Sequence, residues 1–222
     1  MCGRFTLRSI DRIRLALGDR INLEYVPPRY NIAPTQPVVT VIDDHVEELV
    51  WGLIPNWSKE PKGIINARAE TLDDKASFSE SFQKRRCLIL ADGFYEWRRV
   101  GKARQAFFFQ KRDETAFAFA GIWDRWRNGE LSIKSCALVT TTANEVLRPV
   151  HDRMPVMLRE GSYETWLDSQ VSPVELKKLL EPYPSEEMKS HPVSSQVNYT
   201  DIDNEGLIKR VDVEVGTIPS LF

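Results

Sequence analysis

The sequence predicts an α+β protein: a single domain with a β-rich, mainly antiparallel and barrel-like core, decorated by short helices. Strand-like apolar runs outnumber helical patterns, and the connections between them are short, which favours antiparallel pairing. No internal repeat and no Pro/Gly/Ser-rich linker divides the 222 residues, and this length fits one domain with a sizeable core. We therefore expect one domain over residues 1–222.

The first part of the chain is expected to hold one helix and one hairpin. Ser9 is a suitable N-cap and Gly18 a suitable end for a short helix. The prolines between Pro27 and Pro37 interrupt regular structure in the segment that follows. In chain order we expect a helix over Ser9–Leu17, an irregular segment over 21–36, a hairpin of Val38–Ile42 and Val46–Trp51 with a turn at Asp43–Asp44, a loop over 55–63 and a weakly helical segment over Ala69–Phe82.

The second part of the chain is expected to consist mainly of strands. A helix over Ser162–Leu167 and another over Pro173–Leu180 should follow them. The latter has Ser172 as its N-cap, a proline at its first position and Glu175 to complete a capping box. The segment from Val193 onward carries little pattern and is expected to be extended. The strand candidates are Cys87–Ala91, Phe94–Arg99, Ala106–Gln110, Ala116–Trp123 and Leu131–Thr141, with a turn at Val100–Gly101.

The cysteines and histidines argue against a disulfide framework and against a metal site. The three cysteines are Cys2, Cys87 and Cys136; none forms a CxxC pair, and their number is odd. Cys87 and Cys136 lie in apolar strand-like runs, where a cysteine is most simply a small core residue. The three histidines are far apart and have no metal-ligand spacing. We expect no metal and no cofactor.

Charge and hydropathy restrict the partners of this chain. The formal net charge is −2, whereas proteins that coat nucleic acid are usually basic, so any binding to DNA requires a local basic groove. No apolar run approaches the roughly 20 residues of a membrane helix, and the segment MCGRFTLRS lacks the apolar centre of a signal peptide. We expect a cytoplasmic monomer without a membrane partner, associated with the nucleoid when bound to DNA.

Cys2 is the most informative residue, because removal of Met1 would leave its thiol beside a free α-amine. The amine has an ordinary pKa of about 7.7–8.0 and the thiol of about 8.5, so both are partly deprotonated near neutral pH. Such an aminothiol condenses with an aldehyde to an imine, and the thiol then closes a five-membered thiazolidine ring. Gly3 and Arg4 follow directly and would allow close approach and phosphate binding. The alternative is that a cysteine stands at this position by chance.

Several separate blocks of sequence accompany this start. They are Arg29–Pro34 (RYNIAP), Trp51–Pro55 (WGLIP), Asn66–Glu70 (NARAE), Asp92–Trp97 (DGFYEW), His151–Pro155 (HDRMP) and His191–Val193 (HPV). With the MCGRF start, they closely resemble the SRAP family (SOS response-associated peptidase-like proteins), from Cys2 to about Pro192. The resemblance implies recognition of abasic sites in single-stranded DNA and a thiazolidine DNA–protein crosslink through Cys2. The resemblance also brings in an activity first predicted for the family: a thiol autopeptidase that exposes this cysteine by removing the residues before it.

Three further residues are candidates for the chemistry. Glu96 lies between Tyr95 and Trp97, and such apolar surroundings raise a carboxyl pKa and suit a proton shuttle. The resemblance implies that Glu96 is the acid/base, that His151 stabilises the sugar and promotes imine formation, and that Asn66 contacts Cys2 and the sugar. The alternatives are an ion pair of Glu96 with a nearby arginine, a core position for His151 and a local turn network for Asn66.

A second set of residues is expected to contact the DNA strand. The arginines of this set fall in or beside the matching blocks, a pattern that fits a groove along a single-strand backbone. Trp57 would stack on a base; some family members carry two adjacent tryptophans here, whereas this chain has Trp57 and Ser58. The ordinary alternative for each arginine is a solvated surface, and for Thr141 a strand end. The full set is Arg4, Asn31, Pro34, Trp57, Arg68, Arg85, Arg86, Thr141 and Arg153.

The sequence therefore predicts a DNA-damage protein whose partner is single-stranded DNA with an abasic site. We expect it to crosslink covalently through Cys2, with residual strand-cleaving lyase activity and reversal of the crosslink. A thiol peptidase, with Cys2 as nucleophile activated by His151 and Glu96, remains an alternative. A module that binds single-stranded DNA without covalent chemistry is the other alternative, and its affinity would depend strongly on salt.

Overall fold

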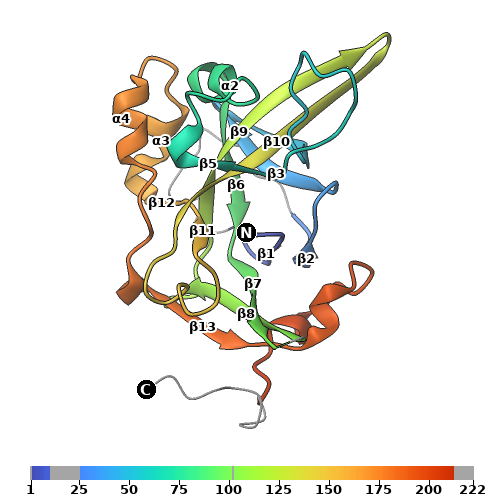
Figure 1. The fold of residues 1–222 in the computed structure, drawn as a ribbon, viewed down its shortest axis with the longest axis vertical. Helices are drawn as coiled ribbons and strands as arrows, with labels where there is room; N and C mark the ends of the chain where they lie inside the picture. Colours follow the sequence, from blue (N-terminus) through green and yellow to red (C-terminus); the bar gives the residue numbers. More distant parts are fainter. Residues whose placement is uncertain (1, 11–25, 102, 213–222) are drawn as a thin grey trace.

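The computed structural model describes residues 2–10, 26–101 and 103–212 and arranges them around two β-sheets (Figure 1). The smaller sheet is antiparallel throughout and contains the first strand of the chain at an inner position. In spatial order its strands are β13 (Met188–Pro192), β8 (Ala103–Lys111), β7 (Gly93–Val100), β1 (Arg4–Leu7) and β2 (Arg29–Ile32).

The larger sheet has eight strands and curls back on itself. Its strands are β11 (Arg153–Pro155), β10 (Leu131–Thr142), β4 (His45–Trp51), β3 (Pro37–Ile42), β6 (Arg86–Ala91), β9 (Phe117–Asn128) and β12 (Met157–Leu158), with β5 (Asn66–Arg68) beside β10. Pairing of β9 with β10 closes a ring, but the β4–β10 link spans only two residue pairs, so the strands form a ring and not a true barrel. The predicted α+β, mainly antiparallel class is confirmed.

Short helices cover the larger sheet along one side of the molecule (Figure 1). The capping box predicted at Ser172 and Glu175 is present and begins α4. None of the helices within the described ranges has the length and apolar character that crossing a membrane requires. The helical elements are α2 (Ser79–Lys84), α3 (Tyr163–Leu167) and α4 (Pro173–Lys178), with 3-10 turns η2 (Ala69–Thr71), η3 (Glu160–Ser162), η4 (Ser185–Glu187), η5 (Ser195–Asn198) and η6 (Glu205–Ile208).

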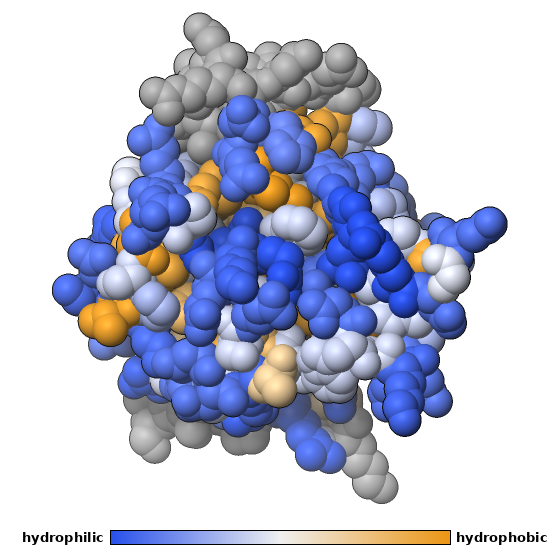
Figure 2. Space-filling view, turned by 90° about the horizontal axis from the view of Figure 1, so that it is seen from above, coloured by the Kyte–Doolittle hydropathy of each residue, from blue (hydrophilic) through white to orange (hydrophobic). Residues whose placement is uncertain are grey.

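The main core lies inside the ring of strands and anchors β1. Phe5 of β1 is fully buried and packs edge-on against Trp51 and Phe119, with ring centroids 5.1 and 5.8 Å apart. Cys87 and Cys136 are buried and free, as the sequence predicts. Seen from above, hydrophilic residues cover most of the surface and hydrophobic ones show only between them (Figure 2).

Residues Val193–Val211 form a strap that packs on the outer face of β7 and β8 (Figure 1). Val193, Val197 and Leu207 of this C-terminal strap form a second small core with Tyr95 and Phe108. The strap contains η5 and η6, each begun by a side-chain cap, so the expectation of an extended tail was wrong. Short-range turns within η5 and η6 and hydrogen bonds from distant residues hold its main chain, and neither produces a periodic pattern in the sequence.

Three other segments differ from expectation. The segment expected to be irregular contains β2, because Arg29–Ile32 pairs with β1. The main-chain N–H groups of this strand also donate hydrogen bonds to the side chain of the distant Asp203. The segment expected to be weakly helical forms only η2 and α2, with turns between them. β1 and β5 are short strands whose pairing partners lie far along the chain, which a local pattern does not reveal. The helix expected over Ser9–Leu17 lies almost wholly outside the described residues.

Candidate active site

Cys2 lies two residues before the start of β1, in the interior of the protein. Its side chain is fully buried, and the thiol lies 3.6 Å from the carbonyl oxygen of Arg4. The carbonyl oxygen of Cys2 accepts a hydrogen bond of 3.0 Å from Asn66 Nδ2. Because β1 is held between β2 and β7 and anchored by Phe5, the position of Cys2 is set by the rigid part of the fold.

Glu96 of β7 is brought to Cys2 by strand pairing. β1 runs antiparallel to β7 with Arg4 opposite Tyr95, so Glu96 lies beside the residues that precede β1. The Glu96 side chain is buried, and burial raises the pKa of its carboxyl above the usual value, while the nearby His151 opposes the rise. Burial, and secondarily the charge of Glu96, also raises the pKa of the Cys2 thiol. Both groups therefore favour their protonated forms more than they would in water.

His151 lies in the turn that leads into β11 and is partly exposed. Its Nδ1 accepts a hydrogen bond of 2.9 Å from the main-chain N–H of Arg153 and lies 3.0 Å from Asp152 Oδ1. In the neutral ring the first contact places the proton on Nε2; a protonated ring would instead donate from Nδ1 to Asp152. The charge of His151 lowers the pKa of the Glu96 carboxyl, so His151 lies close to Glu96 and, with it, to Cys2 and Asn66.

Asn66 begins β5 and retains an unused acceptor. Its Nδ2 bonds to Cys2, but its buried Oδ1 has no hydrogen-bond partner among the residues that the structure describes. A buried amide oxygen without a donor is costly, so such an atom commonly indicates a ligand or a water. We name Cys2, Asn66, Glu96 and His151 the active-site cluster. They come from four distant parts of the sequence.

Arg153 and Arg68 lie next to this cluster. Arg153 forms a two-pronged ion pair with Glu70, at 2.6 and 2.9 Å, and also donates to the Thr140 carbonyl oxygen at 2.6 Å. The hydrogen bond from Arg153 lowers the pKa of the Glu70 carboxyl. Arg68 is exposed and lies two residues after Asn66 in the same strand, so both side chains point to the same side of β5.

The other residues expected to contact DNA lie in different environments. Arg4 is half-buried and donates to the Gly3 carbonyl oxygen at 2.8 Å. Trp57 is 61% exposed, with its ring nitrogen 3.4 Å from the Ala76 carbonyl oxygen. Pro34 is half-buried in the turn between β2 and β3, and Thr141 is buried in β10 opposite Met154.

Two expected DNA contacts, Arg86 and Asn31, use their hydrogen-bond donors inside the protein. Arg86 is buried, and all three of its guanidinium nitrogens donate to main-chain carbonyls, namely those of Trp166, Phe82, Gln83 and Asp168. The Asn31 amide is also buried and donates to three carbonyls of the C-terminal strap. The donors of both side chains are already used inside the protein, whereas the buried Asn31 Oδ1 has no hydrogen-bond partner among the described residues. The expected DNA contact of Arg86 is therefore corrected, while that of Asn31 stays a prediction.

Arg85 is engaged in ion pairs at the surface. Its guanidinium lies 3.1 Å from Glu80 and 3.3 Å from Asp124. Asp124 also accepts from the main-chain N–H of Asn56 at 2.9 Å, so Arg85 helps to position the loop that carries Trp57. The structure links Arg85 to this loop and not directly to the active-site cluster.

Two features of this region were not found from the sequence. Glu70 stands in the NARAE block, yet its pairing with Arg153 depends on β5 and β11 flanking β10, which no local signal indicates. A pocket of about 370 Å³ beside Cys2 is lined by Gly3, Arg4, Trp97, Arg104 and Asn198. It combines the first residues, the β7–β8 hairpin and the C-terminal strap, so only the folded chain brings it together.

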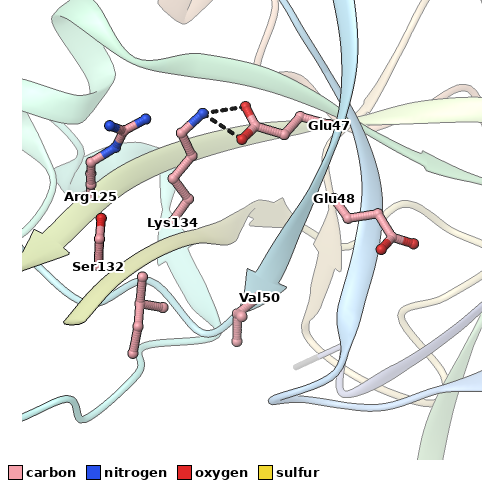
Figure 3. A pocket seen from close by; sticks show the side chains of 7 residues that line it. Glu47, Glu48, Val50, Arg125, Ser132 and Lys134 are labelled. Atoms are coloured by element: carbon pink, nitrogen blue, oxygen red, sulfur yellow. Dashed lines mark hydrogen bonds and ion pairs between the residues drawn. The ribbon is translucent and has the colours of Figure 1, made fainter. Parts of the chain in front are cut away.

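A separate cavity of about 550 Å³ opens between β4 and the first half of β10. Lys134 and Glu47 reach toward each other across it and form an ion pair (Figure 3). None of the expected site residues lines this cavity, and its main opposite charges neutralise each other. Within the described ranges, His, Cys, Asp and Glu side chains do not gather in any group that could hold a metal ion.

The fold and the active-site cluster together define a class of protein. Its larger sheet forms a ring of strands, and a buried cysteine before β1 lies next to an amide, a carboxyl and an imidazole. The chain belongs to the SRAP family, since residues 1–200 match the family described as SOS response associated peptidase (SRAP).

Relatives of known name match most of the chain. The abasic site processing protein YoqW of Bacillus subtilis (strain 168) is 40% identical over 215 residues, which cover 89% of this chain and 94% of the relative. The abasic site processing protein YedK of Escherichia coli (strain K12) is 30% identical over 219 residues, covering 93% and 97%. The abasic site processing protein HMCES of Xenopus tropicalis is 32% identical over 176 residues, covering 67% of this chain and 52% of the relative.

Solved structures support the same fold. A protein from Bacteroides thetaiotaomicron superposes with a TM-score of 0.83 at 23% sequence identity, covering 95% of this chain and all of that chain. A protein from Bordetella bronchiseptica superposes with a TM-score of 0.75 at 24% identity, covering 87% of this chain and all of that chain.

Proposed function

We propose that this protein processes abasic sites by forming a covalent crosslink between Cys2 and the abasic sugar of single-stranded DNA. The observation that carries the proposal is the active-site cluster, in which Asn66 is bonded to Cys2 and the buried Glu96 and His151 lie close by. The names of the relatives supply the substrate class. Removal of Met1 is required, because the chemistry needs the α-amine of Cys2.

The reaction begins with the abasic sugar, which is mostly a closed hemiacetal. A neutral Glu96 carboxyl protonates the ring oxygen, the C1′ hydroxyl loses its proton, and the aldehyde is released. The raised pKa of Glu96 supports this role, since it keeps the acid form populated at higher pH than in an ordinary carboxyl. The unused Asn66 Oδ1 is placed to accept a hydrogen bond from the amine or from a sugar hydroxyl.

Two bond-forming steps follow. The α-amine of Cys2 adds to C1′, and loss of one water leaves an imine, with His151 as a proton donor and acceptor for that step. The thiol sulfur then bonds to C1′ while the thiol proton passes to the imine nitrogen, which gives the thiazolidine. Ring closure diverts the imine from β-elimination and so protects the strand; incomplete closure would give residual lyase activity. The reverse steps, with Glu96 as acid/base, would release the DNA.

We assign binding of the single-stranded DNA to arginine side chains and one aromatic side chain beside the active-site cluster. Arg68 is exposed, and Arg153 would exchange its Glu70 partner for a phosphate. Arg4 lies two residues after Cys2, and Thr141 neighbours the Thr140 carbonyl that accepts a hydrogen bond from Arg153. The exposed indole of Trp57 offers a surface for base stacking, worth about 1–3 kcal/mol per base.

The direct test is incubation of the purified protein with a single-stranded oligonucleotide that carries one abasic site. We expect an adduct that survives denaturation, with the mass of protein minus Met1 plus DNA minus one water. Cys2→Ala should form no such adduct, and neither should protein that retains Met1. An equal adduct from Cys2→Ala, or none from wild type with a free N-terminal cysteine, would refute the proposal.

The family description names a peptidase, so a thiol peptidase is the second candidate. A cysteine nucleophile acts as the thiolate, whereas burial and the charge of Glu96 raise the pKa of the Cys2 thiol. Peptide cleavage, or removal of an artificial N-terminal extension, that disappears in Cys2→Ala would favour this alternative. Salt-dependent binding that is indifferent to a free aldehyde would instead favour a non-covalent single-strand binder.

A further inference from the structure

The pocket beside Cys2 differs in chemistry from the active-site cluster. Its five lining residues are Gly3, Arg4, Trp97, Arg104 and Asn198, and none of them carries a negative charge. Two guanidinium groups, an indole and an amide thus surround a space of about 370 Å³ that begins one residue from Cys2. Cations next to an aromatic side chain form the combination that binds a phosphate and a base together.

The aromatic wall of this pocket is held in place by the C-terminal strap. Trp97 Nε1 donates to Asn198 Oδ1 at 2.8 Å, and the indole packs partly against the second small core. This leaves Trp97 half-buried and restricted, so a base would stack on a surface that is already ordered. The strap is therefore part of the site as well as part of the fold.

The cationic wall carries a second, independent sign of an anionic ligand. Arg104 of β8 lies directly opposite Arg99 of β7, and both are exposed. Like charges directly opposite each other destabilise an antiparallel pair. In the part of the chain that the structure describes, neither guanidinium is matched with a carboxylate. A phosphate in the pocket would relieve this repulsion.

We propose that Arg4, Trp97, Arg104 and Asn198 form a subsite for the nucleotide next to the abasic sugar, on one side of the lesion only. This inference rests on the proposed function. A phosphate would bind Arg104 and Arg4, and the adjoining base would stack on Trp97. The subsite orients the strand so that C1′ faces Cys2, and it gives the reaction a preference for DNA that continues in one direction from the lesion.

The test uses Arg104→Ala, because Arg104 is exposed and its removal should leave the fold intact. Rates of adduct formation are measured with two oligonucleotides, one whose nucleotides lie only 5′ of the abasic sugar and one whose nucleotides lie only 3′. We expect a loss of about 5-fold with one of them, the size of one lost phosphate contact at low salt. Arg104→Lys should retain part of the rate.

Two controls make the result specific. Arg127→Ala removes the same charge from an exposed position at the end of β9 and should change neither rate. Free 2-deoxyribose is too small to reach the subsite, so Arg104→Ala should react with it as wild type does. An equal loss with both oligonucleotides, an equal loss with 2-deoxyribose, or no loss at all would overturn the subsite.

A non-covalent measurement separates failure of the subsite from failure of the crosslink. Affinity is measured by fluorescence anisotropy for single strands with a tetrahydrofuran abasic analogue, which has no aldehyde. Arg104→Ala should reduce the slope of log affinity against log salt by about 1. An unchanged slope contradicts the subsite even if wild type forms the adduct, whereas a reduced slope supports it even if no adduct forms.

Discussion

Two buried polar regions of this molecule use their side chains in opposite ways. At Arg86, every guanidinium nitrogen donates to a main-chain carbonyl; two of the four acceptors belong to α2 and two to the end of α3. In the active-site cluster, the Asn66 Oδ1 atom lacks a donor among the described residues, and the pKa of the Glu96 carboxyl is raised by burial. The first arrangement is complete within the fold. The second retains capacity for hydrogen bonding and proton transfer, which is what a substrate requires.

The largest effect that would test this contrast is expected from Glu96→Gln. The amide is similar in shape but cannot deliver a proton, so the rate of adduct formation should fall about 1,000-fold, within the usual range for a lost general acid. In wild type the rate should rise as the amine loses its proton and fall again as pH passes the raised pKa of Glu96. Glu96→Gln should lose the falling limb. A pH–rate profile of the variant that keeps both limbs would assign the acid to another residue.

Arg86→Ala should have the complementary effect, on stability alone. Loss of the guanidinium leaves four carbonyls without their donor, two of them fully buried, and we expect the free energy of unfolding to fall by about 3 kcal/mol. Adduct formation per folded molecule should stay at the wild-type level. Denaturant titration and adduct kinetics at low temperature measure the two quantities. A stable variant with poor DNA affinity would show that Arg86 contacts the strand after all.

The same contrast explains which parts of the structure the sequence could predict. Arg86 and Arg153 are both arginines in segments of mixed polar and apolar residues, and no local sequence feature distinguishes them. Their roles diverge because α2 and α3 enclose Arg86, whereas β11 presents Arg153 beside β5. Long-range packing decides this, so the sequence identified candidate side chains without their environments.

The fold shows a similar division. The β3–β4 hairpin and the strands from β6 to β10 have clear apolar patterns and turn residues, and the sequence predicted them well. β1, β2 and β5 are short strands that exist because distant segments pair with them. These three strands carry or support Cys2 and Asn66, so the least predictable strands are those that build the active-site cluster.

A smaller effect is expected at Asn66, where the donor and the acceptor can be separated. Asn66→Ala removes both and should slow adduct formation about 10-fold, the size of one hydrogen bond of about 1.4 kcal/mol. Asn66→Asp keeps an acceptor oxygen but loses the donor to Cys2. If the unused Oδ1 binds the substrate, Asn66→Asp should retain more activity than Asn66→Ala. The reverse order, measured with the same abasic oligonucleotide, would mean that Asn66 acts only by holding Cys2.

The smallest effect is expected from Glu70→Gln, and it should be a gain. Glu70 neutralises Arg153 through two hydrogen bonds, and the carboxylate has to give way before Arg153 can bind a phosphate. Without this competition, the affinity for single-stranded DNA should rise about 3-fold at low salt and approach the wild-type value at high salt, where exposed charges are screened. Fluorescence anisotropy across a salt series measures this change, and Glu130→Gln, at an exposed turn, is the matched control. A fall in affinity would mean that Glu70 orients Arg153 toward the strand, so that Arg153, like Arg86, depends on an internal partner for its function.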